Sequence, residues 1–215
     1  MGKVRLEITM SLDGFIAGPN PSLEHGLGEG GEALHEWVFG LKSWRESHGR
    51  EGGEENQDSE LLAEGIRTNG AIVMGRGMFS LGSGPWEDDP NRDAWWGDEP
   101  PFGVPVFIVT HHARASEEKK GGTTFNFVTD GVESAVEQAR EAAGDRSVTI
   151  AGGANVFQQA FNAGLVDELN VHVAPLLLGA GTPLFENLGD NPPALEISRT
   201  VESAAVTHVT YRVVN

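Results

Sequence analysis

Val148–Phe157 reads VTIAGGANVF, a run rich in β-branched residues that meets two glycines and continues into an amphipathic segment. This order predicts a buried strand, a tight turn and a helix that begins near residue 154. Glycine lets the backbone come close to a ligand, and the first N–H groups of a helix have no partner within it. The stretch therefore predicts either a simple tight turn or a pyrophosphate site. The second reading assigns the site to Gly152, Gly153, Ala154, Asn155 and Val156.

Strand-like and helix-like runs alternate on both sides of this stretch, as is typical of an α/β domain with a mostly parallel central sheet. We expect the strands at residues 4–11, 71–74, 105–110, 125–129, 147–151 and 166–173. Helices are expected at 34–44, 132–139 and 154–161, and a further helix is expected to begin after an N-cap at Asp58. Residues 195–201 and 209–213 alternate apolar and polar side chains, which predicts half-buried antiparallel strands at one sheet edge. Residues 1–215 are expected to form a single domain.

The composition limits the possible partners. There are 15 Lys plus Arg against 32 Asp plus Glu, a formal net charge of -17, which repels nucleic acid and anionic lipid. A phosphate group must therefore be bound by local N–H groups and a few cations. The absence of cysteine excludes disulfides and thiolate zinc sites and fits a cytoplasmic protein. The charged residues among the first ten argue against a signal peptide, and the longest apolar runs are too short to span a membrane.

Two more expected strands end in residues suited to a ligand. Gly75 and Arg76 follow Val73-Met74, and an arginine at this edge either holds a phosphate or is merely solvated. Thr110 and His111 follow the strand at 105–110, with a second histidine next in the chain. Because neighbouring side chains on a strand point to opposite faces, we expect no metal there.

Two loop segments complete the candidate sites. Asp13, just before Gly14, either caps its own turn or touches the ligand. Residues 26–31 satisfy the pattern G-x-G-x-x-G, but they do not follow a strand directly, so they are interpreted as a flexible loop. Residues 46–56 and 86–103 are also expected to be loops.

Several ordered segments resemble the dihydrofolate reductase superfamily and, more closely, the reductase half of the bifunctional deaminase-reductase of riboflavin biosynthesis. They are MSLDGFIA at 10–17, VMGR at 73–76, PVFIVTH at 105–111 and AGGANV at 151–156, completed by VDEL at 166–169 and PLLLG at 175–179. The resemblance implies a three-layer sandwich, NADPH as the cofactor and a homodimer.

The resemblance also implies roles for individual residues. Ala17 and the backbone near Asp13 are expected to lie beside the nicotinamide. The adenosine phosphate is expected to meet Gly75, Arg76, Thr110 and His111, and the pyrophosphate to meet residues 152–156. Asp13 is the candidate catalytic residue, as a polar substrate contact. The aromatic residues expected either to line the substrate pocket or to belong to the core are Phe15, Trp37 and Phe79.

Two departures from the family narrow the function. No carboxylate aligns within residues 32–45 with the acid that dihydrofolate reductases use, and without cysteine the zinc site of the deaminase half is missing. We therefore expect an NADPH-dependent reductase of a small carbonyl, imine or ring substrate, nearest to 5-amino-6-(5-phosphoribosylamino)uracil reductase. The alternatives are a pteridine or dihydrofolate reductase, and a nucleotide-binding protein of the same fold without turnover.

Overall fold

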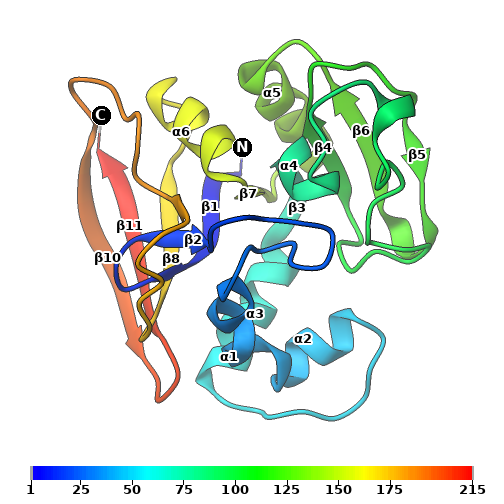
Figure 1. Ribbon diagram of the computed structural model, residues 1–215. Helices are drawn as coiled ribbons and strands as arrows, with labels where there is room; N and C mark the ends of the chain where they lie inside the picture. Colours follow the sequence, from blue (N-terminus) through cyan, green and yellow to red (C-terminus); the bar gives the residue numbers. More distant parts are fainter. Residues whose placement is uncertain (1, 215) are drawn as a thin grey trace.

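The structure is a computed structural model that describes residues 2–214. Across these residues a nine-stranded sheet has the order β10-β11-β8-β1-β7-β3-β4-β6-β5 (Figure 1). Strands β8, β1, β7, β3, β4 and β6 run parallel, and β11, β10 and β5 are antiparallel to their neighbours. The bounds are β1 (Val4–Ser11), β3 (Asn69–Gly75), β4 (Pro105–Val109), β5 (Glu117–Glu118), β6 (Thr124–Val128), β7 (Ser147–Gly152), β8 (Glu168–Ala174), β10 (Ala194–Glu202) and β11 (Thr207–Val214). The predicted fold class is confirmed.

Helices and short elements cover this sheet. The helices are α1 (Glu36–Phe39), α2 (Lys42–Ser47), α3 (Gln57–Thr68), α4 (Arg76–Ser80), α5 (Val132–Ala143) and α6 (Ala154–Asn162). The 3-10 turns are η1 (Gly31–His35), η2 (Trp86–Asp88) and η3 (Lys120–Gly122), and β2 (Phe15–Ala17) pairs with β9 (Thr182–Pro183) apart from the main sheet. Within residues 2–214, no helix is both long enough and apolar enough to cross a membrane.

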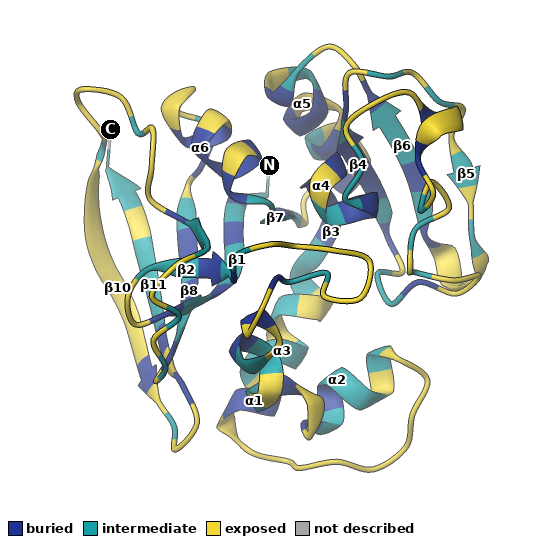
Figure 2. Cartoon of the chain, viewed as in Figure 1, coloured by how far each residue is buried: buried dark blue, intermediate teal, exposed yellow. Residues whose placement is uncertain are grey.

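The two faces of the sheet are packed differently. α5 and α6 bury one face, where Leu6, Val73 and Ile150 belong to one apolar core. On the other face, α4 and the segment after it form a second apolar cluster with β3, β4 and β6, which includes Phe79 and Phe125. Figure 2 shows the buried residues concentrated on the central strands and on the inner sides of α5 and α6. The part of that second face over β1, β8 and β11 is polar and is covered by η1, α1 and α3.

The predicted helix over 34–44 is wrong, because the structure breaks it into η1, α1 and α2. The break falls at Leu41, which is extended with φ -73° and ψ 141°. The chain is held there by a bridge to residue 54, in which Glu54 N donates to Gly40 O and Lys42 N donates to Glu54 O. A pairing with a distant loop residue therefore overrides the local helical spacing.

Two finer predictions also need correction. Asn56, not Asp58, caps α3, since its side-chain oxygen accepts a hydrogen bond of 2.9 Å from Ser59 N. Asp58 is instead buried against the sheet. The antiparallel hairpin at the sheet edge is confirmed, but β10 is not half-buried: apart from Val201 its residues are exposed. As the outermost strand, β10 has no helix above it (Figure 2).

Replacing Phe157 tests the packing of α6. Its ring is fully buried in the larger core. We expect Phe157→Ala to lower the free energy of unfolding by about 3–5 kcal/mol, because it leaves a cavity. The measurement is urea denaturation, with Gln159→Ala, at an exposed position of the same helix, as the control expected to cost about 0.5 kcal/mol or less. Equal losses in the two variants would contradict this packing.

Candidate functional site

The strand-to-helix turns after β3 and β7 lie directly against each other. A Cβ placed on Gly75 would come within 3.0 Å of a Val156 methyl, and one placed on Gly152 within 3.0 Å of the Met78 sulfur. Gly152 has φ 145°, and its peptide bond to Gly153 is cis. A side chain at 75 would crowd Val156, and one at 152 would crowd Met78 and would also have to adopt a positive φ that favours glycine.

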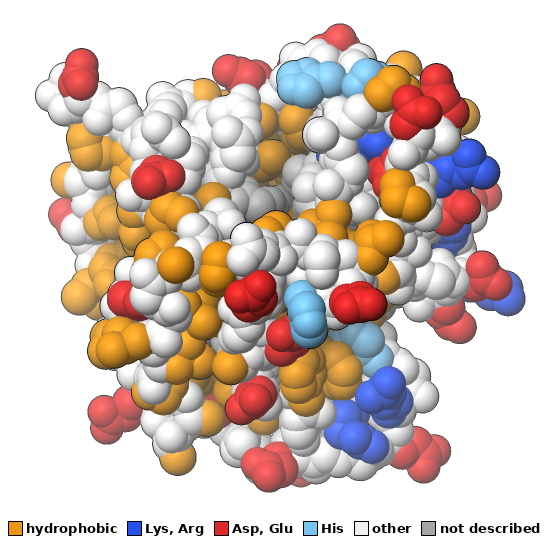
Figure 3. All heavy atoms as spheres, in the orientation of Figure 1, with side chains coloured by type: hydrophobic (Ala, Val, Ile, Leu, Met, Phe, Trp, Pro, Cys, Tyr) orange, Lys and Arg blue, Asp and Glu red, His pale blue; other side chains and the backbone are white. Residues whose placement is uncertain are grey.

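The N-terminus of α6 is open at this junction. A Cβ on Gly153 would meet no atom within 4 Å. Gly153 O accepts from the N–H groups of Val156 and Phe157, whereas within residues 2–214 no group accepts from those of Ala154 and Asn155. Figure 3 shows the surface hollowed between the regions that Figure 1 labels α6 and α4. Free N–H groups at the positive end of a helix dipole suit a phosphate oxygen.

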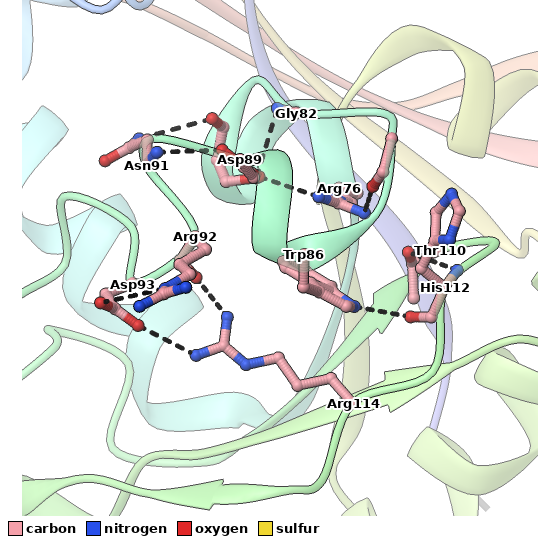
Figure 4. A network of polar contacts seen from close by, with 12 residues as sticks. Arg76, Gly82, Trp86, Asp89, Asn91, Arg92, Asp93, Thr110, His112 and Arg114 are labelled. Carbon is pink, nitrogen blue, oxygen red and sulfur yellow. Dashed lines mark hydrogen bonds and ion pairs between the residues drawn. The ribbon is translucent and has the colours of Figure 1, made fainter.

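The structure does not leave the Arg76 guanidinium free for a phosphate. The side chain is 5% exposed, and its Nη2 lies 2.9 Å from Asp89 Oδ2. Its other terminal nitrogen donates to Gly84 O, and its guanidinium carbon lies 3.6 Å from the centre of the Trp86 ring (Figure 4). The arginine therefore fastens the segment after α4 to the end of β3 and does not offer a phosphate fork.

We call the contact between Arg76 and Asp89 the Arg76 clasp, and Asp89 makes further contacts in it. Its Oδ2 also accepts from Ser80 Oγ at 2.7 Å, and its Oδ1 accepts from Asn91 N at 2.9 Å. Burial raises the pKa of Asp89, but the hydrogen bonds from Arg76 and Ser80 outweigh burial and hold the pKa below its usual range. Asp89 therefore stays ionised and keeps Arg76 paired.

Two histidines, exposed His111 and half-buried His112, follow the end of β4. Thr110 is buried, its Oγ1 accepts from His112 N at 3.2 Å, and its own N–H donates to Val128 O. His111 is exposed. Among residues 2–214, no three His, Asp or Glu side chains are grouped as metal ligands.

Asp13 holds a loop in place. Its carboxylate accepts hydrogen bonds from Ser11 Oγ at 2.6 Å, Leu178 N at 3.1 Å and Gly179 N at 2.7 Å. The Ser11 hydroxyl and the two N–H groups, acting against desolvation, hold its pKa below the usual range. Asp13 thus ties the loop after β8 to the turn before β2. The last residue of β2, Ala17, is half-buried. Its contact with a substrate stays a prediction.

The three predicted pocket aromatics separate in the structure. Phe79 is 1% exposed and packs edge-on against Phe125 at 5.2 Å, so it belongs to the core and does not line a pocket. Phe15 is half-buried in β2. Trp37 lies on α1 over the polar face of the sheet, where its Nε1 donates to Thr9 Oγ1 at 3.2 Å.

Sequence reasoning missed the residues beneath Trp37. Its ring packs on His172 and His208, with centroids 5.1 Å and 5.3 Å away. These histidines come from β8 and β11, which are far apart in the sequence. The available signal was the alternation of polar residues along strands expected to be buried, such as Glu7 and Thr9 in β1.

Residues 2–209 match the model of the RibD C-terminal domain family. The chain belongs to this family. The predicted resemblance is therefore confirmed, and the RibD-type domain spans nearly the whole chain. No curated protein sequence matched.

Solved structures share the fold. A candidate riboflavin biosynthesis protein of Shewanella sp. PV-4 has a TM-score of 0.64 at 20% identity, with 99% of both chains covered. The Thermotoga maritima diaminohydroxyphosphoribosylaminopyrimidine deaminase/5-amino-6-(5-phosphoribosylamino)uracil reductase has 0.58 at 14%, covering 99% of this chain and 57% of that one. Dihydrofolate reductase of Enterococcus faecalis, complexed with NADP(H), has 0.51 at 14%, with 100% and 98% covered. The RibD-type chain thus has a dihydrofolate-reductase-like fold.

The Arg76 clasp makes Asp89 a test of stability. Asp89→Ala leaves a buried guanidinium without its counter-charge, so we expect the free energy of unfolding to fall by about 3–5 kcal/mol. The measurement is urea denaturation. Asp93→Ala is the control, since that exposed carboxylate pairs with Arg114 at the surface, and we expect it to cost about 1 kcal/mol or less. If Asp89→Ala costs no more than the control, the clasp is not a stabilising element.

Proposed function

We propose that this RibD-type protein is an NADPH-dependent reductase that delivers hydride to a small carbonyl, imine or conjugated ring substrate. The nearest named activity is the reduction of 5-amino-6-(5-phosphoribosylamino)uracil, which stands in the name of the Thermotoga maritima relative. The observation that carries the proposal is the open turn at Gly153, where the first N–H groups of α6 have no protein acceptor.

The residues present fit a dinucleotide. We place the pyrophosphate in front of Gly153, where a Cβ would meet no atom within 4 Å, so that its oxygens would accept from the N–H groups of Ala154 and Asn155. Gly75 and Val156 pack against each other next to this position. Ala17 would border the nicotinamide. Bound NADPH supplies the hydride. The chain supplies the orientation of the two reactants and a site from which water is excluded.

The acidity of the chain makes the phosphate site local. At a net charge of -17 the protein repels anions at long range, so helix N–H groups carry the attraction. With Arg76 held by Asp89, exposed His111 is the remaining predicted contact able to carry charge near the adenosine phosphate. The same acidity argues against nucleic acid and membrane partners. We propose a small-molecule substrate handled in the cytoplasm.

The first helical layer favours a pyrimidine over a pterin substrate. A pterin reductase presents a carboxylate from this layer to the substrate. Here the carboxylates of η1, α1 and α2, at Glu32, Glu36 and Glu46, are exposed, and Asp58, the buried carboxylate of α3, is paired with His208. Methotrexate binding would report a pterin pocket and would favour dihydrofolate or pteridine reduction instead.

A fluorescence titration of the tryptophans with NADPH and NADH tests the cofactor. We expect NADPH to bind, and Gly153→Val to weaken it at least about tenfold, near 1.4 kcal/mol, because the new side chain fills the space that the pyrophosphate needs. Gly40→Val is the matched control, since a Cβ there also meets no atom within 4 Å but lies on the distant helical layer. Failure of the wild type to bind either dinucleotide would refute the reductase proposal.

We also propose that two copies pair through the β10 edge. This strand is the outermost of the sheet, and it exposes 66% of Ile197 and 40% of Leu195. An unpaired strand edge with apolar side chains is a ready surface for a second copy of the same chain.

Light scattering tests the dimer. We expect the mass of two chains for the wild type and of one chain for Ile197→Glu, because the carboxylate would be buried opposite its symmetry mate. Leu23→Glu, at an exposed loop position, is the control and should remain dimeric. A monomeric wild type at micromolar concentration would refute the pairing.

A further inference from the structure

A chain of four ionisable side chains, two buried and two half-buried, links α3 to three strands of the sheet. Asp58 Oδ1 lies 3.0 Å from His208 Nε2, and His208 Nδ1 lies 2.7 Å from His172 Nδ1. His172 Nε2 lies 3.0 Å from Glu7 Oε1. The side chains of Asp58 and His208 are 5% and 7% exposed. We call this set the histidine chain.

The contacts determine how many protons the histidine chain holds. A carboxylate only accepts hydrogen bonds, so Nε2 of each histidine must carry a proton. The short contact between the two Nδ1 atoms then needs one proton between two lone pairs, because two lone pairs or two N–H groups would repel each other. The pair therefore holds three protons on four nitrogens, which is one shared positive charge.

The surrounding charges favour this state. Arg5 Nε lies 3.8 Å from Glu7 Oε2, and Asn170 donates to the same carboxylate at 2.9 Å. Two carboxylates, Arg5 and the shared proton sum to zero, and a buried group of zero net charge avoids a large desolvation cost. Burial raises the pKa of Glu7, but the hydrogen bond and the charge of His172 outweigh it and hold that pKa below its usual range.

The other titratable groups facing the histidine chain leave that balance intact. Burial, and then the charge of His172, lower the pKa of His208 against the opposing effect of Asp58. Burial, together with the charge of His172, also lowers the pKa of His35 in η1, so His35 stays neutral. Farther out, the ion pairs Arg199–Glu64 and Lys3–Glu168 line the same cavity and satisfy each other.

We propose that His172 and His208 are positioning residues for Trp37, which is predicted to line the substrate pocket, and that they hold its indole in place through one shared proton. Trp37 packs on both imidazoles and donates to Thr9 Oγ1, so the histidine pair supports the indole from below. A positive imidazolium against an indole ring is itself attractive. The role at the substrate pocket rests on the proposed function; the shared proton does not.

The geometry predicts a window of pH for this arrangement. A second proton makes both Nδ1 atoms donors, and loss of the shared proton makes both acceptors, so the link breaks on either side. A cavity of about 310 Å³, lined in part by Arg5, Glu7, His172 and His208, gives solvent access to the pair. The α1–α3 layer is therefore attached most firmly at intermediate pH.

Nuclear magnetic resonance of the ligand-free protein with ¹⁵N-labelled histidine tests the shared proton. We expect one strongly downfield ring N–H resonance near neutral pH, coupled to Nδ1, with both Nε2 atoms protonated. It should vanish in His208→Gln, which keeps a donor toward Asp58 but has nothing at Nδ1, and persist in His25→Gln, an exposed histidine. A wild type without this resonance, whose two histidines titrate independently, would overturn the proposal without any variant.

Hydrogen exchange and kinetics test the positioning role. Protection of the α1 and α3 amides should pass through a maximum with pH in the wild type and be flat in His208→Gln. In that variant the KM for 5-amino-6-(5-phosphoribosylamino)uracil should rise about tenfold, with NADPH affinity unchanged. Unchanged protection and KM would overturn the positioning role. If the wild type does not bind NADPH, the reductase proposal is refuted. The resonance and the hydrogen-exchange results would still test the histidine chain in that case.

Discussion

The close approach of two strand-to-helix turns organises this molecule. A Cβ on Gly75, at the end of β3, would crowd Val156, and a Cβ on Gly152, at the end of β7, would crowd Met78. Because the parallel strands end at the same edge, α4 and α6 begin beside each other there. The open backbone at Gly153, which is the proposed cofactor site, lies beside that contact.

The helices on the two faces of the sheet are attached by different kinds of contact. α5 and α6 are held by apolar burial, which is non-directional and changes little with pH. The α1–α3 layer covers a polar strip of β1, β8 and β11 and is attached by directional contacts such as Asp58 to His208 and Trp37 to Thr9. The layer that carries Trp37 is thus the one whose attachment depends on protonation. In a reductase, the position of Trp37 would then depend on pH, while the layer of α5 and α6 would not.

Arg76 shows how a local motif acquires a different role in three dimensions. An arginine directly after a buried strand is a reasonable phosphate ligand from sequence alone. Its counter-charge, Asp89, lies thirteen residues later in a segment without periodicity, and the fold brings that carboxylate to 2.9 Å. Moving the Arg76 guanidinium from Asp89 to a phosphate would leave Asp89 as a buried charge without a partner. Under the proposed function, any selectivity for the cofactor's phosphates would therefore have to come from other groups at this edge.

The amino-acid sequence by itself determined the central hydrophobic strands, the places of α3, α5 and α6 between them, the C-terminal hairpin and the glycine turn at 152–153. These depend on periodicity and on backbone permissiveness, which are local properties. Only the tertiary structure decided that Leu41 breaks a helix, that Phe79 is core and that His172 meets His208. Each of these outcomes depends on a partner distant in the chain, whose approach no local pattern records.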